Sequence, residues 1–298
     1  MIDFHKPALA DKEWINRKIE ETGCPSCEYT FGNIFAYTAK MDLMVAEYAE
    51  CLVTRCIYDG KLMYCYPIGN GDKKAAVEAI ISDAASLGSS FIIFGLTKEF
   101  ADELEDNFPE IFTITFDRGG SDYIYSRQDL VTLIGKKYQP KRNHISFFKK
   151  NFNWTYERIS RDNIDDCIRM NEKWIEESLE ERQDELKQEL EIIKLVFDNY
   201  EDLDFVGGLI RVDAEVIAYT MGERMNDETF CVHFEKAFSS YRGAYPMINR
   251  EFCERELGAY NFVDREDDLD VDNLRKAKLS YYPVVIKEEF EAELKNAD

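Results

Sequence analysis

The chain has 298 residues, with 37 basic and 59 acidic side chains and a formal net charge of −22. Hydrophobic residues make up 45% and aromatic residues 13%, ordinary values for globular proteins that exclude a disordered chain. With a net charge this negative, most of the surface repels phosphate groups. The composition therefore excludes binding of a nucleic acid or an anionic membrane over a broad area of the surface. Residues 1–150 carry 18 basic and 22 acidic side chains, whereas residues 151–298 carry 19 and 37. The length suggests two domains.

The N-terminal residues lack the pattern of a signal peptide, and no apolar run approaches the ~20 residues that cross a bilayer. The eight cysteines lie mostly in apolar stretches, as is typical of reduced thiols, so we expect a cytoplasmic protein without a membrane span. Cys24-Pro-Ser-Cys27 is the one closely spaced pair, and the three histidines are scattered. We therefore expect no metal.

The first half alternates between strand-like and helix-like segments. A hairpin over residues 43–58 and 61–67 turns at Asp59-Gly60, and Asp72 is placed to cap a helix at 73–87. A strand at 91–95, a helix at 98–107, strands at 111–116 and 122–126, and a helix at 127–134 follow. Pro140 suits the first turn of the next helix, which we expect to end near residue 152.

The second half repeats this order. It opens with a strand at 154–158 and a long acidic helical stretch at 164–200, followed by a hairpin over 207–211 and 216–222. A strand at 229–236, a helix at 245–257, a strand at 260–263, a short helix at 271–277 and a closing strand at 282–286 complete it. The two copies of a duplicated α/β domain keep the same order of strands and helices, so this shared order indicates a duplication.

Residues 130–156 reverse the charge of the chain. This segment has no acidic residue, and its basic side chains are Lys136, Lys137, Lys141, Arg142, Lys149 and Lys150. Such a cluster at a helix start can bind phosphate or a nucleic-acid backbone. Alternatively, the cluster pairs with the acidic helical stretch, which carries Glu172, Glu176, Glu177, Glu180, Glu181, Asp184 and Glu185. The sequence leaves both interpretations open.

Charged residues also gather where open α/β sheets place ligands, at the end of a strand. Arg265 and Glu266 follow the strand at 260–263, and Arg275, Lys276 and Lys278 form a basic patch ten residues later. The alternative is an exposed loop whose acids cap the next helix.

The strand at 229–236 carries a second candidate group. Alternation puts His233 and Glu235 on one face and Lys236 on the other. Glu235 is a candidate general base and Lys236 a candidate oxyanion stabiliser, while a structural ion pair is the alternative.

Four stretches resemble one bacterial family. They are CEYTFGNI (27–34), DYIYSR (122–127), GKKYQPKRNHI (135–145), and DREDDL (264–269) with LRKAKLSY (274–281). The family comprises soluble proteins related to the C-terminal domain of phosphatidylglycerol lysyltransferase, and the resemblance spans roughly residues 23–287. It implies an α/β (α+β) fold of two tandem GNAT-like (acyl-CoA N-acyltransferase) domains, as in FemXAB peptidyltransferases. Each is a mixed central sheet flanked by helices, and we expect them at 1–150 and 151–298.

The resemblance also implies site residues. The first domain ends in a basic joining helix, and Lys137, Arg142, Asn143 and His144 are its candidate binding residues. Arg242 and Gly243 join Glu235 and Lys236 on the strand and loop that hold the acyl donor in GNAT folds. The last motif adds Arg265, Glu266, Asp268, Arg275, Lys276, Lys278 and Tyr281.

The function implied is aminoacyl or acyl transfer to a soluble amine or hydroxyl acceptor, a small molecule or a peptide. The donor is aminoacyl-tRNA bound on the basic joining helix, or acyl-CoA. Glu235 would act as the base, Lys236 would stabilise charge, and the second domain would bind the ligand. A CoA-dependent N-acetyltransferase is one alternative, although Ser240–Tyr245 keeps only the central glycine of a pyrophosphate-binding loop. A non-catalytic binding module is the other. Since the lysyltransferase's membrane-spanning half is missing, we expect a soluble acceptor instead of a phospholipid.

Overall fold

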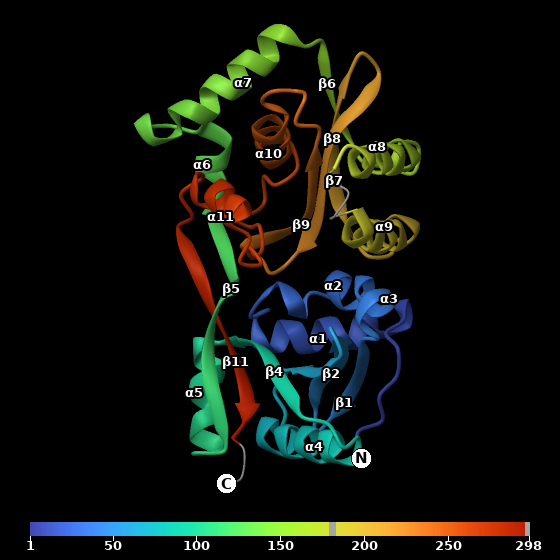
Figure 1. The fold of residues 1–298 in the computed structure, drawn as a ribbon, viewed down its shortest axis with the longest axis vertical. Helices are drawn as coiled ribbons and strands as arrows, with labels where there is room; N and C mark the ends of the chain where they lie inside the picture. The colour runs from blue at the N-terminus through green and yellow to red at the C-terminus, as the bar shows by residue number, and fades with distance from the viewer. Residues whose placement is uncertain (179–182, 296–298) are drawn as a thin grey trace. The chain divides into compact units, whose positions relative to one another are not determined.

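The computed structural model describes residues 1–178 and 183–295 (Figure 1). The chain forms two compact units. The first unit comprises Met1–Tyr123, Glu266–Lys276 and Ile286–Asp298, and the second comprises Ile124–Arg265 and Ala277–Val285. The boundary expected at residue 150 therefore falls inside the second unit, because the basic helix before it packs on a helix of that unit.

The first unit contains a sheet with the strand order β1-β2-β3-β4-β11-β5. The strands are β1 (Met44–Tyr48), β2 (Cys51–Tyr58), β3 (Lys61–Cys65), β4 (Phe91–Thr97), β5 (Phe112–Ser126) and β11 (Val285–Leu294). The helices are η1 (Leu9–Asp11), α1 (Lys12–Thr22), η2 (Cys27–Tyr29), α2 (Phe31–Ala36), α3 (Thr38–Met41), α4 (Lys73–Ser86) and α5 (Lys98–Asn107). β3 pairs with β4 in parallel, whereas β2 pairs antiparallel with both β1 and β3.

In the first half of the chain, the turn and the helix cap that depend on neighbouring residues lie where the sequence predicts them, whereas two of the predicted strands differ. Asp59-Gly60 joins β2 to β3, and Asp72 caps α4 by accepting a hydrogen bond from Ala75 N at 2.9 Å, both as predicted. The single strand expected over 43–58 is wrong: it is β1 and β2, joined at Ala49 and Glu50 with φ of 49° and 63°. The strands expected at 111–116 and 122–126 are one strand, β5.

The last strand also differs from the expectation. β11 begins at Val285 and pairs antiparallel with β4, with Glu289 opposite Thr97, so it belongs mainly to the sheet of the first unit. The strand expected at 282–286 to close the second half is therefore wrong. The buried positions Glu289 and Ala292 lie in an acidic run that lacks an apolar alternation.

The second unit contains the strand order β5-β10-β9-β8-β7-β6. Its other strands are β6 (Trp154–Arg158), β7 (Val206–Val212), β8 (Glu215–Arg224), β9 (Thr229–Ala237) and β10 (Phe262–Asp264). Its helices are α6 (Arg127–Thr132), η3 (Lys136–Tyr138), α7 (Gln139–Asn151), α8 (Ile164–Glu176), α9 (Gln183–Asp198) and α10 (Ala244–Arg255), and α11 (Asp272–Leu279) ends in it. The long acidic helix expected over 164–200 is two helices, α8 and α9, and Glu180 and Glu181 lie outside the described residues.

Helices cover both faces of the strands of the second unit. α8 and α9 lie on one face of β7–β9 and α10 on the other (Figure 1). Leu209, Tyr219, Met247 and Phe252 are buried in the core between these layers. α10 also packs against α6 and α7.

Within the described ranges, every helix is too short or too polar to cross a membrane.

Candidate functional site

The two residues expected to act together in catalysis lie on opposite faces of the second unit's sheet. Lys236 Nζ lies 2.8 and 2.7 Å from the two carboxylate oxygens of Glu189 on α9, and 4.6 Å from the Trp174 ring centroid on α8. Glu235 faces α10, where Asn249 Nδ2 donates to its Oε2 at 3.4 Å. This geometry corrects the expectation for the pair, because one reacting group cannot contact both side chains.

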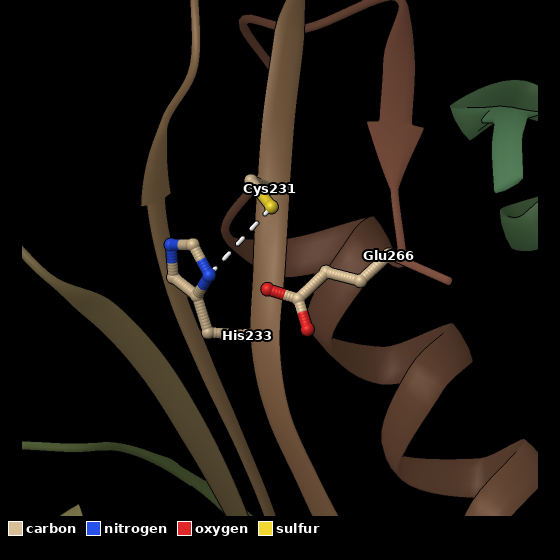
Figure 2. A group of neighbouring side chains, drawn as sticks. All are labelled: Cys231, His233 and Glu266. Carbon is tan, nitrogen blue, oxygen red and sulfur yellow. Dashed lines mark hydrogen bonds between the residues drawn. The ribbon is translucent and has the colours of Figure 1, made fainter. Parts of the chain in front are cut away.

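His233 lies at an irregularity of β9, because Val232 pairs with Gly222 and Phe234 with Met221, and this interrupts the alternation expected to place His233 on the face of Glu235. Its side chain is held within the core. Figure 2 shows Cys231 and His233 pointing toward one another, with 3.8 Å between Cys231 Sγ and His233 Nδ1. His233 Nε2 lies 3.0 Å from Glu223 Oε1, and the imidazole stacks on Phe205 with 5.5 Å between ring centroids. Both ring nitrogens are thus engaged, as in a structural histidine.

Glu235 instead forms a buried ion pair with the first residue after β10. Arg265 Nη2 donates to Glu235 Oε1 at 2.9 Å, and the two side chains are 14% and 11% exposed. Burial opposes the charge of Arg265, but Glu235 and the nearby Tyr125 and Tyr281 raise the pKa of its guanidinium overall. The alternative of a structural ion pair on β9 therefore holds for Glu235, with Arg265 as its partner.

Two tyrosines and a lysine complete the surroundings of Arg265. Its guanidinium carbon lies 5.0 Å from the Tyr281 ring centroid and 5.6 Å from that of Tyr125. Lys141 Nζ, from α7, lies 3.7 Å from the centroid of the same Tyr281 ring. Burial and the charge of Arg265 lower the pKa of Lys141 to about 8, although Glu235 opposes them. We call Lys141, Glu235, Asn249, Arg265, Tyr125 and Tyr281 the Arg265 cluster.

Two polar atoms of the Arg265 cluster lack a hydrogen-bond partner among the residues that the structure describes. They are Arg265 Nη1, a donor, and Asn249 Oδ1, an acceptor, and both are buried. A buried polar atom without a partner costs about 1–3 kcal/mol, so such groups are rare in folded proteins unless they serve a ligand. One donor and one acceptor therefore remain for a molecule bound beside the Glu235–Arg265 pair.

The loop after β10 is fixed by Lys278, one of the expected binding residues. Lys278 Nζ donates to the backbone oxygen of Arg265 at 2.5 Å, and its own backbone oxygen accepts from Tyr125 Oη at 2.9 Å. Tyr138 Oη, from η3, donates to the backbone oxygen of Tyr281 at 3.1 Å. Lys278 therefore positions Arg265 and presents no free charge to a ligand.

The basic joining helix is less available to an anion than expected. Arg142 donates to the backbone oxygens of Leu133 and Gly135 and so fixes the turn before α7. Asn143 Oδ1 accepts from Gln139 Nε2 at 2.7 Å, and His144 is half-buried.

The ion pairs described for this segment differ from the expected alternative. Lys149 Nζ lies 3.2 Å from Glu251 Oε1 on α10, and Lys137 Nζ lies 3.9 Å from Asp129 Oδ2 on α6. The partners are therefore on α6 and α10 and not on the acidic helical stretch. Lys136 and Lys150 are exposed at the two ends of the segment.

Gly243 brings α7 and α10 into close contact. Its φ is 96°, and a Cβ at this position would lie under 3.0 Å from the backbone oxygen of His144. Ala244 N is already bonded to the backbone oxygen of Tyr241, and Pro246 has no N–H. The start of α10 therefore has few donors for a pyrophosphate. Arg242 is exposed and lies 4.7 Å from the Phe147 ring.

The rest of the last motif belongs to the first unit. Asp268 is fully buried and accepts two hydrogen bonds from Arg275, at 2.8 and 2.7 Å, and one from Tyr123 Oη at 2.5 Å. Burial opposes the charge of Asp268, but these donors lower its pKa overall. Glu266 adopts a φ of 57°, and its backbone oxygen accepts from Tyr123 N, while Lys276 is exposed. Asp268 and Arg275 thus anchor the loop that follows Arg265.

Three members of the Arg265 cluster were missed as site residues. Lys141 was counted within the basic segment, but nothing in the sequence indicated that an aromatic ring would bury it. Asn249 stands between the apolar residues Ile248 and Phe252 of a helix, and its position on a buried face was the one available signal. Tyr125 lies in a stretch that the resemblance quoted as a motif without a role.

Comparisons with solved structures identify the fold. A conserved protein of unknown function from Bacteroides thetaiotaomicron is 38% identical, with a TM-score of 0.93 over 99% of this chain and 100% of that one. L-PGS from Bacillus licheniformis is 15% identical, with a TM-score of 0.67 over 97% and 93%. A tandem GNAT protein from the clavulanic acid biosynthesis pathway is 10% identical, with a TM-score of 0.52 over the full length of both chains. The α/β, tandem GNAT-like fold expected from the sequence is confirmed.

Sequence comparisons identify the family. An uncharacterised protein of Mycoplasmoides gallisepticum is 27% identical over 174 residues, or 56% of this chain, and the chain spans about half of that relative, 54%. The family model described as "Phosphatidylglycerol lysyltransferase, C-terminal" matches residues 22–292. The protein therefore belongs to the family of the phosphatidylglycerol lysyltransferase C-terminal domain.

Proposed function

We propose that the protein transfers an aminoacyl group from a charged tRNA to a soluble amine or hydroxyl acceptor, and that the Arg265 cluster is the reaction site. Family membership and the GNAT-like fold support an acyltransferase-type function. The observation that carries the site is the pair of buried atoms without partners, Arg265 Nη1 and Asn249 Oδ1. Arg265 also lies near Lys141, whose pKa is lowered to about 8 by burial and by the charge of Arg265.

The residues of the cluster match the needs of acyl transfer. When an acceptor amine attacks the acyl carbon, the carbonyl oxygen becomes anionic, and a fixed donor stabilises it. In the proposal Arg265 Nη1 is that donor, and Glu235 holds the guanidinium in place. Lys141 in its neutral form takes the proton of the amine and returns it to the ribose hydroxyl as the ester bond breaks. A lysine tuned near pH 8 suits this role.

The start of α10 argues against CoA as the donor. Pyrophosphate binding at a helix start depends on free backbone N–H groups. In α10 one of these is bonded to Tyr241, and Pro246 lacks another. The close approach of α7 also accounts for Gly243 without a pyrophosphate. We therefore favour a charged tRNA over acyl-CoA.

The donors are compared directly. The protein is incubated with bulk aminoacyl-tRNA carrying radiolabelled amino acids, or with labelled acetyl-CoA. Free lysine, spermidine and a tripeptide serve as amine acceptors, and glycerol serves as a hydroxyl acceptor. We expect label to move from tRNA to at least one acceptor and none to move from acetyl-CoA. Transfer from acetyl-CoA alone would overturn the choice of donor. If label moves to no acceptor from either charged tRNA or acetyl-CoA, the result would favour a non-catalytic binding module.

Binding of tRNA is tested on the exposed lysines of the basic segment. We expect Lys136→Glu with Lys150→Glu to weaken binding of bulk tRNA and to lower the dependence of log affinity on log salt by about 1 or more, because each phosphate contact releases counterions. The matched control reverses two exposed lysines elsewhere in the second unit, Lys173→Glu with Lys187→Glu, and should leave binding unchanged. Equal effects of the two double variants would contradict a specific tRNA surface.

A further inference from the structure

A group of acidic side chains and a thiol lies buried within the first unit, outside the Arg265 cluster. Cys27 and Glu28 come from η2, Asp122 from β5 and Glu289 from β11. Cys27 and Asp122 are buried, Glu28 is half-buried and Glu289 is 4% exposed. The backbone N–H of Glu289 donates to Ser121 Oγ at 3.4 Å, so Asp122 and Glu289 come from neighbouring positions on β5 and β11.

The donor atoms are spaced as ligands of a tetrahedral metal ion. Cys27 Sγ lies 3.6 Å from Asp122 Oδ1 and 3.4 Å from Glu28 Oε1, and one ligand atom from each residue lies within 4.8 Å of the others. Zinc bonds of about 2.3 Å to sulfur and about 2.0 Å to oxygen, at the tetrahedral angle, place sulfur and oxygen about 3.5 Å apart. The observed separations therefore fit one ion bound by all three residues.

Glu289 provides a second, independent observation. Glu289 lies outside the group whose ligand atoms are all within 4.8 Å of one another, but it lies near Glu28, and its Oε1 is buried without a hydrogen-bond partner among the described residues. No ion pair of the described residues involves Glu28 or Glu289. A buried carboxylate among like charges is costly unless a cation or a proton neutralises it.

We propose that Cys27, Glu28 and Asp122 bind a zinc ion that fixes η2 to strand β5, and that this ion offsets the buried charge of the neighbouring Glu289 on β11. A thiolate together with carboxylates favours zinc over magnesium or calcium, which take oxygen ligands. The site replaces the expectation of no metal, and it uses only one cysteine of the Cys24-Pro-Ser-Cys27 pair, since Cys24 Sγ bonds to the backbone oxygen of Ser26.

The test measures zinc binding by the full chain after dialysis against a chelator. Competition with a chromogenic chelator gives the affinity, and thermal unfolding with and without zinc gives the stabilisation. We expect one tightly bound zinc per chain and a rise in melting temperature when zinc is added. Glu289→Gln and Asp122→Asn should each weaken binding at least about 10-fold, as even changes around metal ligands do. Glu288→Gln, an exposed neighbour on β11, is the matched control and should bind as the wild type does.

Cobalt provides a readout that does not depend on stability. Co²⁺ bound in place of zinc should show a thiolate-to-metal absorption band, and Cys27→Ser should remove that band while Cys24→Ser retains it. Absence of stoichiometric binding would overturn the proposal and would mean that shared protons neutralise the carboxylates. Equal zinc affinity of Glu289→Gln and Glu288→Gln would also overturn it, as would a cobalt band that survives Cys27→Ser.

Discussion

Glu235→Gln tests whether the Glu235–Arg265 pair behaves as a buried pair. The substitution keeps the shape of the side chain and removes its charge, so a guanidinium that is only 14% exposed loses its counterion. Breaking a buried pair by removing one partner costs about 3–5 kcal/mol. The rings of Tyr125 and Tyr281 still face the guanidinium and contribute about 0.5–2 kcal/mol between them, so we expect a loss near the lower end, about 3 kcal/mol.

Urea unfolding measures this loss without adding salt. Replacing both partners, as Glu235→Gln with Arg265→Met, should recover at least about 2 kcal/mol of it, because the double variant leaves no unpaired buried charge. Glu201→Gln is the control, since Glu201 pairs with Arg161 in the same unit and their side chains are 59% and 76% exposed. It should cost under about 1 kcal/mol. A loss of the same size for Glu235→Gln and Glu201→Gln would refute the assignment of a buried pair.

Three further predictions follow from the same unit. Gly243→Ala should lower the free energy of unfolding by at least about 2 kcal/mol, because it combines a positive φ with a backbone clash, whereas Gly258→Ala has open space and should cost under about 1 kcal/mol; urea unfolding compares them. The transfer rate should rise with pH through about 8 as Lys141 loses its proton, and Lys141→Met should remove this rise in a pH–rate profile; a rise that persists would exclude Lys141 as the base. Lys236→Met should destabilise the protein because it leaves Glu189 unpaired. It should change kcat less than about 3-fold, since Lys236 lies on the other face of the sheet. A larger loss of kcat in folded protein would show that Lys236 belongs to the reaction site.

Local patterns were enough to predict most elements of the fold. The Asp59-Gly60 turn, the Asp72 cap and the helix start at Pro140 are determined by neighbouring residues, and each was found where expected. The turn at Ala49-Glu50 was missed because neither residue favours positive φ, so only pairing with the rest of the sheet selects it. The pairing of β11 with β4 depends on contacts between residues almost two hundred positions apart, which periodicity does not report.

The candidate site was predicted only in part, because a sequence shows local signals but not which distant helices pack together. Alternation along β9 correctly separated Glu235 from Lys236, yet both were assigned to one reaction. Arg265 was found from its place after a strand, a local signal. Lys141 and Asn249 join it only because α7 packs against α10, which covers this face of the sheet, and their chemistry depends on burial that a single sequence does not show.

The most direct test of the central claim is aminoacyl transfer by Arg265→Lys. A lysine keeps a positive charge beside Glu235 but has no second fixed donor in place of Nη1. If this donor stabilises the oxyanion, kcat/KM for transfer from charged tRNA should fall about 100-fold or more, as for other oxyanion donors, while Arg255→Lys on α10 should stay within about 3-fold of the wild type. Transfer by folded Arg265→Lys at the rate of the wild type would contradict the assignment of the Arg265 cluster as the reaction site.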